Sequence, residues 1–273
     1  MRIGVLGCAG RMGRAVIEAV LDGPRLELAG GTEAAGSSAL GQDLGSLVGR
    51  EPTGRVVSDD PAPLLARADA VIEFSAPDAT AANAEAAAAA RVAHVIGTTG
   101  LEPRHDRRIE AAARRIPIVR AANMSLGINL LLGLAEQVAR ALPGEQFDAE
   151  IVEMHHRHKV DAPSGTALAL GEAVALGRRV DLGTAADRGR DGMTGARRAG
   201  AIGFAALRGG DVVGDHTVIF AGAGERIELT HRATDRRIYA RGAVRAACWT
   251  AGRPPGLYGM AEVLGLRSPE AAG

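Results

Sequence analysis

The stretch MHHRHKVDAPSGTALAL, residues 154–170, places three histidines, an arginine and a lysine within six consecutive positions. Imidazole, guanidinium and ammonium groups at this density suit three kinds of chemistry. They could ligate a metal, contact nucleic acid, or bind an anion to which protons are transferred. The residues that follow the cluster, together with the rest of the chain, decide among the three.

Metal ligation is disfavoured by the charges inside the cluster. His155 and His158 have an HxxH spacing, but Arg157 and Lys159 stand beside them and would repel a dication. In an extended segment, His155 and His156 also point to opposite faces. We therefore expect no metal at this site.

Nucleic-acid binding explains the cluster even less well. Aromatic residues make up 3% of the 273-residue chain, so no stacking platform accompanies the positive charge. The chain carries 32 basic and 32 acidic residues, whereas nucleic-acid and anionic-membrane binders depend on excess positive charge. We expect neither nucleic acid nor membrane as a partner. A solvated basic loop remains the alternative without chemistry.

The residues after the cluster favour an anion site. DAPSGTALAL predicts a helix start, where Ser164 or Thr166 can act as the cap and the first N–H groups are unpaired. A carboxylate can bind there while His156 or Lys159 neutralises its charge. An imidazole such as that of His155 exchanges a proton near neutral pH. The segment therefore predicts an anion cradle with a proton donor.

A second stretch with chemical content is GCAGRMG, residues 7–13, between a predicted strand and a predicted helix. Gly7 would permit a tight turn, Gly10 a close approach of backbone to phosphate, and Gly13 close packing of helix on strand. The helix start adds free N–H groups and a positive dipole, which suit a pyrophosphate. The spacing is a variant of the commoner fingerprint, and a plain glycine-rich turn is the alternative.

Three further segments are expected at the same edge of the sheet. Glu33, twenty residues after Gly13, ends the second strand region, where its carboxylate would accept from a ribose hydroxyl. The loops GTTG (97–100) and AANMS (121–125) follow later predicted strands, although ordinary turn chemistry would also explain them. A dinucleotide loop, an anion cradle and a proton donor in one chain predict hydride transfer to an anionic substrate.

The elements that would position these loops alternate through the first half of the chain. Short apolar runs predict strands at residues 2–7, 26–31, 69–75, 93–99 and 116–122. Helical patterns lie between most of them, such as PDATAANAEAAAAARV and PRHDRRIEAAARR. This alternation indicates an α/β fold with a parallel sheet covered on both faces.

The second half of the chain changes character. Residues 147–156 predict a long strand, and residues 216–233 predict two strands around a glycine turn. We expect a largely open sheet there, with a separate antiparallel sandwich as the alternative. Residues 177–200, rich in Gly and Arg, predict a loop. A helix near 236–251 and the tail 254–266 return to helical spacing, and we expect the tail to pack on the first domain.

The two cysteines and the N-terminus bear on location. Cys8 and Cys248 lie far apart and outside any CxxC spacing, so neither a disulfide framework nor a thiolate zinc site is expected. The N-terminal apolar run is too short for a signal peptide, and no run approaches a membrane span. We expect a cytoplasmic protein.

The histidine segment, extended to EMHHRHKVDAPSGTALALGEA, resembles the signature of the dihydrodipicolinate reductase (4-hydroxy-tetrahydrodipicolinate reductase) family of bacterial lysine and diaminopimelate synthesis. The resemblance covers nearly the whole chain, through GCAGRMG, GQDLG, IEFSAP, GTTG, AANMSLGIN, RGGDVVGDHTVIFAGAGERIELTHRA and RPPGLYGMAEVLGL. It implies a Rossmann-type doubly wound parallel sheet in a dinucleotide-binding domain, residues 1–125 plus 236–273. It also implies a mixed α/β substrate and tetramerisation domain, residues 126–235.

The resemblance further implies the reaction. NAD(P)H would reduce 4-hydroxy-tetrahydrodipicolinate, a small cyclic dicarboxylate, to tetrahydrodipicolinate with loss of water, and the enzyme would be a homotetramer. His155 takes the acid/base position and Lys159 the second proton-donor position. Substrate contacts fall on His156, Gly165 and Thr166, with Ser164 adjacent. Cofactor contacts fall on Gly7, Cys8, Ala9, Gly10, Arg11, Met12, Glu33, Gly97, Thr98, Thr99, Ala121, Ala122, Asn123 and Met124.

One position departs from the family pattern. Many members carry a basic residue directly after the ribose-binding acid, where it meets a 2′-phosphate, and Ala34 stands in that place here. We therefore expect NADH to be preferred over NADPH, with Arg11 as a partial substitute. Another two-domain NAD(P) dehydrogenase, or a redox sensor without turnover, would also explain the glycine loop. Neither accounts for the pairing of HHRHK with PSGT.

Overall fold

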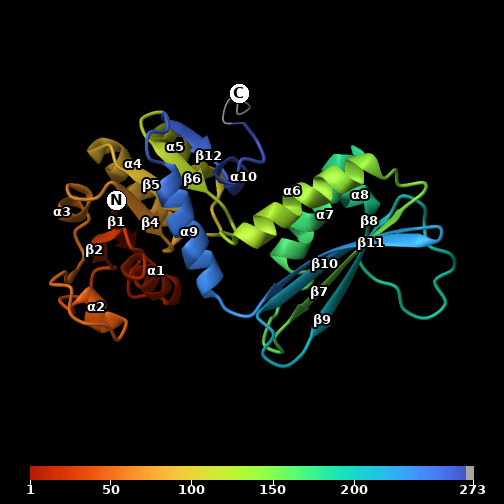
Figure 1. Ribbon diagram of the computed structural model, residues 1–273, viewed down its shortest axis with the longest axis horizontal. Coiled ribbons are helices and arrows are strands. Elements are labelled where there is room, and N and C mark those ends of the chain that lie inside the picture. The colour runs from red at the N-terminus through yellow and green to blue at the C-terminus, as the bar shows by residue number, and fades with distance from the viewer. Residues whose placement is uncertain (269–273) are drawn as a thin grey trace. The chain divides into compact units, whose positions relative to one another are not determined.

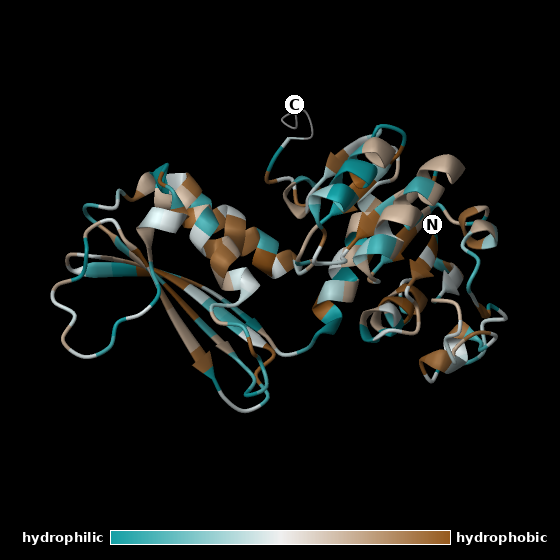
Figure 2. Ribbon diagram, turned by 180° about the vertical axis from the view of Figure 1, so that it is seen from behind, coloured by the Kyte–Doolittle hydropathy of each residue, from teal (hydrophilic) through white to brown (hydrophobic). Residues whose placement is uncertain are grey.

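The computed structural model describes residues 1–268, which divide into two units. The first unit comprises Met1–Leu126 and the residues from Arg237 onward, and the second comprises Gly127–Arg236 (Figure 1). Each unit has its own sheet and its own hydrophobic core. The strands of the first sheet and the helices that cover the second carry many of the hydrophobic residues, brown in Figure 2.

The first unit is built on seven strands. They are β1 (Arg2–Leu6), β2 (Glu27–Thr32), β3 (Val57–Ser58), β4 (Ala70–Glu73), β5 (Ala93–Ile96), β6 (Pro117–Arg120) and β12 (Gly256–Tyr258). All pair in parallel, in the order β12-β6-β5-β4-β1-β2-β3. The predicted Rossmann-type parallel sheet is therefore confirmed. Successive strands are added on one side of β1 up to β3 and on its other side from β4 onward, so the strand order reverses between β1 and β4. A ligand is expected at the carboxyl ends of those two strands.

Helices cover both faces of this sheet because its strands are apolar on both sides. The elements are α1 (Arg11–Leu21), α2 (Leu44–Leu47), α3 (Ala62–Leu65), α4 (Pro77–Ala90), α5 (Pro103–Ala113), α9 (Arg237–Trp249) and α10 (Met260–Val263). Ile3 and Val5 pack into one core with α1 and α9, whereas Leu6 packs into the other with α3, α4 and α5. Because successive side chains of β1 point to opposite faces of the sheet, this one strand contacts the helices on both faces.

The second unit has a five-stranded sheet. Its elements are α6 (Leu126–Ala141), β7 (Asp148–His155), α7 (Gly165–Arg178), α8 (Leu182–Ala185), β8 (Ala186–Asp187), β9 (Ile202–Arg208), β10 (Gly214–Gly222) and β11 (Glu225–Ala233). The order is β11-β10-β7-β9-β8, with β10 antiparallel to its neighbours and the remaining pairs parallel. The sheet is mixed and open, as predicted, and is not a sandwich.

Alternate residues of β7 are buried, namely Ala149, Ile151, Glu153 and His155. Ala149 and Ile151 belong to the core formed with α6, α7 and α8, so the helices lie on that face of the sheet. Because side chains alternate along a strand, Glu153 and His155 share this helix-covered face. Two ionisable side chains in such a position need partners.

Two predictions were wrong in part. Residues 177–200 are not one loop, since α7 continues through Arg178 and α8 and β8 follow. Asp181 caps α8, its Oδ2 accepting from the N–H of Thr184 at 2.8 Å. The tail 254–266 is not purely helical, because β12 adds a parallel strand beside β6 before α10 begins. Within residues 1–268, no helix is both long and apolar enough to cross a bilayer.

Candidate active site

The glycine loop joins β1 to α1 through a turn that needs glycine at two positions. Gly7 has φ +77°, and a Cβ there would lie 2.8 Å from the carbonyl oxygen of Phe74. A Cβ on Gly13 would lie 2.1 Å from the carbonyl oxygen of Gly7, so α1 can begin against the turn only with glycine there. Gly10 is the exposed N-cap and has no side chain to block its backbone. This arrangement fits a pyrophosphate at the helix start.

Glu33 is attached to the glycine loop. Its Oε2 accepts from the backbone N–H of Ala9 at 2.9 Å, and its Oε1 accepts from that of Ala34 at 3.0 Å. The carboxylate thus lies beside the first turn of the loop, where a ribose hydroxyl attached to a bound pyrophosphate would come within reach. Ala34 offers no charge, and the side chain of Arg11 makes no hydrogen bond or ion pair within residues 1–268.

Several of the expected cofactor residues have buried side chains and can reach a ligand only through their backbone. Cys8 is fully buried, and burial, followed by the charge of Glu33, raises the pKa of its thiol to about 12. Met124 belongs to the core around α1 and α9. Thr98 is also buried, its Oγ1 accepting from the N–H of Ser75 at 3.1 Å and from the hydroxyl of Thr80 at 2.9 Å. Among the same predicted residues, the exposed side chains include those of Thr99 and Ala122.

The loop that begins at Gly97 rests on a buried polar cluster that sequence analysis missed. Glu73, at the end of β4, accepts from the hydroxyl of Ser75 at 2.5 Å and from Asn83 at 2.7 Å. His94 Nε2 lies 2.8 Å from Glu73 Oε2, but the pair is not aligned as a hydrogen bond. Burial alone would raise the pKa of Glu73, and its contacts with His94, Ser75 and Asn83 instead lower it.

In the second unit, the histidine segment builds a buried cluster around Glu153. The Oε2 of Glu153 lies 2.5 Å from His155 Nδ1, and both oxygens accept from Arg208 at 2.8 Å. Burial would raise the pKa of Glu153, but hydrogen bonds from Arg208 and then from His155 hold it below its ordinary value. His155 is 9% exposed, so the ring is fixed within the protein and still reaches its surface.

Ser164 connects this cluster to α7. It is the N-cap of the helix, and its Oγ accepts from the N–H of Ala167 at 3.1 Å. The same Oγ lies 3.1 Å from His216 Nε2, and the backbone N–H of Ser164 donates to Glu153 Oε1 at 3.1 Å. The Ser164 hydroxyl is therefore buried and fully engaged by the protein. The exposed start of α7 falls on Gly165, where a Cβ would meet nothing within 4 Å.

Lys159 and His156 stand at the margin of the cluster. Lys159 Nζ donates to both oxygens of Asp161, at 2.7 and 2.9 Å, and its side chain is 20% exposed. Burial, followed by the charge of Arg236, lowers the pKa of His156. A neutral imidazole binds a carboxylate through its N–H rather than through charge, so Lys159 is the stronger candidate for neutralising an anion.

The predicted residues thus fall into two groups, one in each unit. The predicted cofactor residues lie in the turns that follow β1, β2, β5 and β6 or, for Arg11 and Met12, at the start of α1, all at the carboxyl edge of the parallel sheet. The proposed proton donors and substrate contacts lie between β7 and the first turn of α7. Arg208 and His216 were missed, although the alternation along β7 already placed Glu153 beside His155 and required a partner for the carboxylate.

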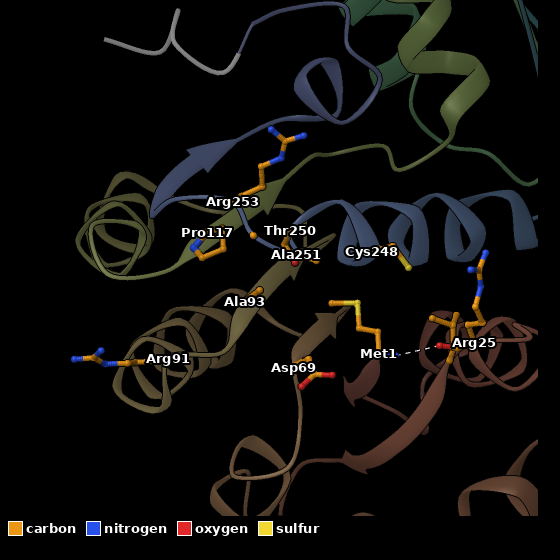
Figure 3. Close-up of a pocket in the computed structure, with 12 residues that line it drawn as sticks. Met1, Arg25, Asp69, Arg91, Ala93, Pro117, Cys248, Thr250, Ala251 and Arg253 are labelled. Atoms are coloured by element: carbon orange, nitrogen blue, oxygen red, sulfur yellow. Dashed lines mark hydrogen bonds between the residues drawn. The ribbon is translucent and has the colours of Figure 1, made fainter.

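A separate hollow of about 670 Å³ lies in the first unit (Figure 3). Asp69, Ala93 and Pro117, which line it, stand just before or at the start of β4, β5 and β6. It therefore lies at the amino edge of the parallel sheet, opposite the edge that carries the glycine loop. Within residues 1–268, no group of three or more His, Cys, Asp or Glu side chains is arranged to hold a metal ion.

Comparisons with known proteins agree with these features. Family models described as "Dihydrodipicolinate reductase, N-terminus" and "C-terminus" match residues 1–124 and 127–264. A 4-hydroxy-tetrahydrodipicolinate reductase of Parvibaculum lavamentivorans is 59% identical over 267 residues, which cover 97% of this chain and 98% of the relative. One of Brucella abortus is 53% identical over 268 residues, covering 98% and 100%. The solved dipicolinate-bound dihydrodipicolinate reductase from Paenisporosarcina sp. TG-14 shares the fold, with a TM-score of 0.78, 23% identity and coverage of 95% and 98%.

Proposed function

Since the chain belongs to the dihydrodipicolinate reductase family, we propose that His155 and Lys159 are the proton donors of its reaction. The protein is an NAD(P)H-dependent oxidoreductase that reduces 4-hydroxy-tetrahydrodipicolinate to tetrahydrodipicolinate with loss of water, in diaminopimelate and lysine biosynthesis. The observation that carries the residue assignment is the position of His155. Its ring is held by Glu153 within reach of the surface, next to the first turn of α7.

The chemistry required of the chain is limited. The reduction consumes one hydride and one proton and releases water, and NAD(P)H supplies the hydride when bound. His155 can give or take a proton at the reacting ring, and Lys159 can deliver a second proton or neutralise a carboxylate. The first-turn N–H groups at Gly165 and Thr166, with His156, would hold a substrate carboxylate through the helix start. Ser164 would support this site as the cap, since its hydroxyl is already engaged.

We assign the two units separate roles. The first would bind the dinucleotide, through backbone at Gly7 to Met12, at Gly97 to Thr99 and at Ala121 to Met124, and through the carboxylate of Glu33. NADH would be preferred, because Glu33 disfavours a 2′-phosphate and Ala34 cannot offset it. The reaction would need no metal, and the pathway would place the enzyme in the cytoplasm.

The second unit would also assemble the protein. Helices cover one face of its sheet, and the other face presents apolar side chains such as Val152, Met154 and Leu207, the last 50% exposed. An open apolar sheet face is a surface that monomeric proteins rarely leave exposed. We expect a homotetramer formed through this face, which sedimentation equilibrium would test.

One assay tests the function directly. Pyruvate, aspartate semialdehyde and the preceding synthase generate the unstable substrate in place, and oxidation of NADH is followed by absorbance. We expect oxidation to depend on both the synthase and this protein. Oxidation that continues without the synthase would point to another dehydrogenase. If NADH is oxidised neither with nor without the synthase, the protein would instead be a cofactor sensor.

A further inference from the structure

We propose that Glu153 is the positioning residue of the active site, holding His155 in one orientation and one tautomer, and that Arg208 keeps its carboxylate ionised. The inference rests on the proposed acid/base role of His155 and assigns the residues that make this role possible. Neither Glu153 nor Arg208 is expected to touch the substrate. Their effect would pass entirely through the imidazole.

Both carboxylate oxygens of Glu153 have two partners each. Oε1 accepts from Arg208 at 2.8 Å and from the backbone N–H of Ser164 at 3.1 Å. Oε2 accepts from the second guanidinium nitrogen of Arg208 at 2.8 Å and lies 2.5 Å from Nδ1 of His155. Glu153 is 1% exposed, so water does not compete for these contacts. A carboxylate held by a bidentate guanidinium and a backbone N–H has one orientation available to it.

The charge on Glu153 determines the tautomer of His155. Hydrogen bonds from Arg208 first, then from His155, oppose the effect of burial and lower the pKa of Glu153, so the group is a carboxylate at neutral pH. An ionised carboxylate only accepts hydrogen bonds. The proton shared with it must therefore sit on Nδ1 of His155, which leaves Nε2 as the nitrogen that exchanges a proton with a substrate.

Arg208 also joins the two proposed proton donors. Its Nη2 donates to the backbone carbonyl of Asp161 at 2.7 Å, and the side chain of Asp161 receives Lys159 Nζ at 2.7 and 2.9 Å. The segment that carries Lys159 is thus tied to the guanidinium that holds Glu153. Removing Arg208 would therefore release both His155 and the segment of Lys159. An ion pair that only joined β7 to β9 would not have this effect.

The other ionisable groups around His155 come from three places. His216, from β10, stands edge-on to the ring with centroids 5.1 Å apart, and burial followed by the charge of His155 lowers its pKa to about 4. It is therefore neutral near pH 7. His156 and Lys159 follow β7, and Arg208, from β9, shares the Oε2 of Glu153 with the ring. Glu153 is the anion in direct contact with His155.

The first experiment replaces Glu153 by glutamine, which keeps its size and removes its charge. We expect kcat to fall by roughly 10- to 100-fold, the range found when the carboxylate partner of a metal-bound histidine is removed, while the KM for NADH stays unchanged. The limb of the kcat/KM profile that reports the imidazolium should move to lower pH, because the charged ring loses its counter-ion. If the contact between Glu153 and His155 served stability alone, the variant would be less stable but this limb would stay at the same pH.

Glu150→Gln is the matched control. Glu150 lies on the same strand and is also bound by arginine, here by Arg190 and Arg197, each at 2.7 Å, but it occupies the other face of β7. We expect its kcat and pH profile to equal those of the parent at matched oligomeric state. An equal loss in both variants would overturn the proposal, since it would show a general effect of breaking arginine–carboxylate pairs.

A spectroscopic measurement tests the tautomer without turnover. In ¹⁵N-histidine-labelled protein, His155 should show the Nδ1–H form in the parent. It should shift toward a mixture in the double variant Glu153→Met/Arg208→Met, which removes both charges of the ion pair together and guards against misfolding of the single variant. An Nε2–H form in the parent, or parental kinetics in Glu153→Gln, would overturn the inference. Full activity in His155→Gln would instead refute the proposed function and leave the tautomer result standing.

Discussion

The carboxylate of Glu33 accepts a hydrogen bond of 2.9 Å from the backbone N–H of Ala9, which joins the residue after β2 to the loop after β1. The N–H groups of Gly7 and Cys8 donate in turn to the carbonyl of Thr32, at 2.9 and 3.0 Å. The acid and the glycine loop are therefore one rigid unit. At the ribose position proposed for Glu33, a negative charge that cannot move away would let the protein discriminate between coenzymes.

Ala34→Arg should shift coenzyme use toward NADPH. Two like charges a few ångströms apart, such as Glu33 and a 2′-phosphate, repel by about 1–4 kcal/mol, depending on the effective dielectric. An arginine next to Glu33 would pair with the phosphate in a bidentate way and offset this repulsion. The measurement is kcat/KM for both coenzymes in parent and variant. A strong NADPH preference in the parent would refute the argument and identify Arg11 as the phosphate partner.

His155→Gln and Lys159→Met should each lower turnover by roughly 100-fold or more, the effect of losing a general acid or base. The affinity for NADH should change little, because both residues lie outside the unit that holds the glycine loop. Steady-state kinetics at saturating substrate, with NADH binding followed by fluorescence, separates the two effects. Near-parental turnover in His155→Gln would show that the acid/base assignment is wrong.

Gly10→Ala and Gly13→Ala should fail in different ways. A Cβ on Gly13 would lie 2.1 Å from a backbone oxygen, so its variant should lose about 1–3 kcal/mol of stability through overpacking. A Cβ on Gly10 would lie 3.4 Å from the same carbonyl oxygen of Gly7, an ordinary contact. Gly10→Ala should therefore stay folded and raise the KM for NADH. Thermal unfolding and coenzyme titration on both variants test the contrast.

Stability should fall with pH below neutrality partly because of His216. Its pKa is lowered from 6.5 to about 4 in the folded protein, so between these values the unfolded chain binds more protons. The stabilisation from the neutral ring is complete above pH 6.5 and is lost as the pH falls through about 4. The difference amounts to on the order of 3 kcal/mol.

His216→Gln is the variant that isolates this contribution. It stays neutral and its amide can still contact Ser164, whose hydroxyl lies 3.1 Å from the histidine in the parent. The free energy of unfolding, measured with urea from pH 7 to pH 4, should fall less steeply in the variant than in the parent. Parallel curves would mean that His216 is not held neutral in the folded state.

Chelators should leave the activity intact. The positive groups around His155, His156 and His158 would repel a dication, and the proposed roles of His155 and Lys159 need only proton transfer and hydrogen bonds. Activity is compared before and after dialysis against EDTA, with metal content measured on the same samples. Stoichiometric zinc whose removal abolishes turnover would contradict the expectation.

The parts of this site that could be predicted are those set by neighbouring residues. Gly7 and Gly13 permit a tight turn and a close start of the helix within a few residues of each other. Ser164, the N-cap of α7, was one of two cap positions that the sequence predicted. Glu33 follows from its distance along the chain in a strand–helix–strand unit. Each of these depends on local geometry, which a pattern of residue types expresses directly.

The parts that could not be predicted depend on strand register. Arg208 stands opposite His155 because β9 pairs with β7, and His216 stands opposite Glu153 because β10 pairs on the other side. Each partner is more than fifty residues away in sequence, and a shift of one residue would turn it to the other face of the sheet. No local pattern encodes this pairing, so the cluster that supports His155 appears only in three dimensions.

The position of β12 and α9 has a consequence for how the chain folds while it is being translated. α9 supplies Ala240, Ala243 and Ala246 to a core shared with β1 and α1, and β12 closes the edge beside β6. On the ribosome, the first 126 residues therefore emerge with one apolar face covered only in part, by α1, and with the edge of β6 unpaired, until more than a hundred further residues have been translated. A chain released early would present both surfaces to other nascent chains. Premature termination or proteolysis before residue 237 should thus produce an aggregating fragment and a burden on chaperones, not a free coenzyme-binding domain.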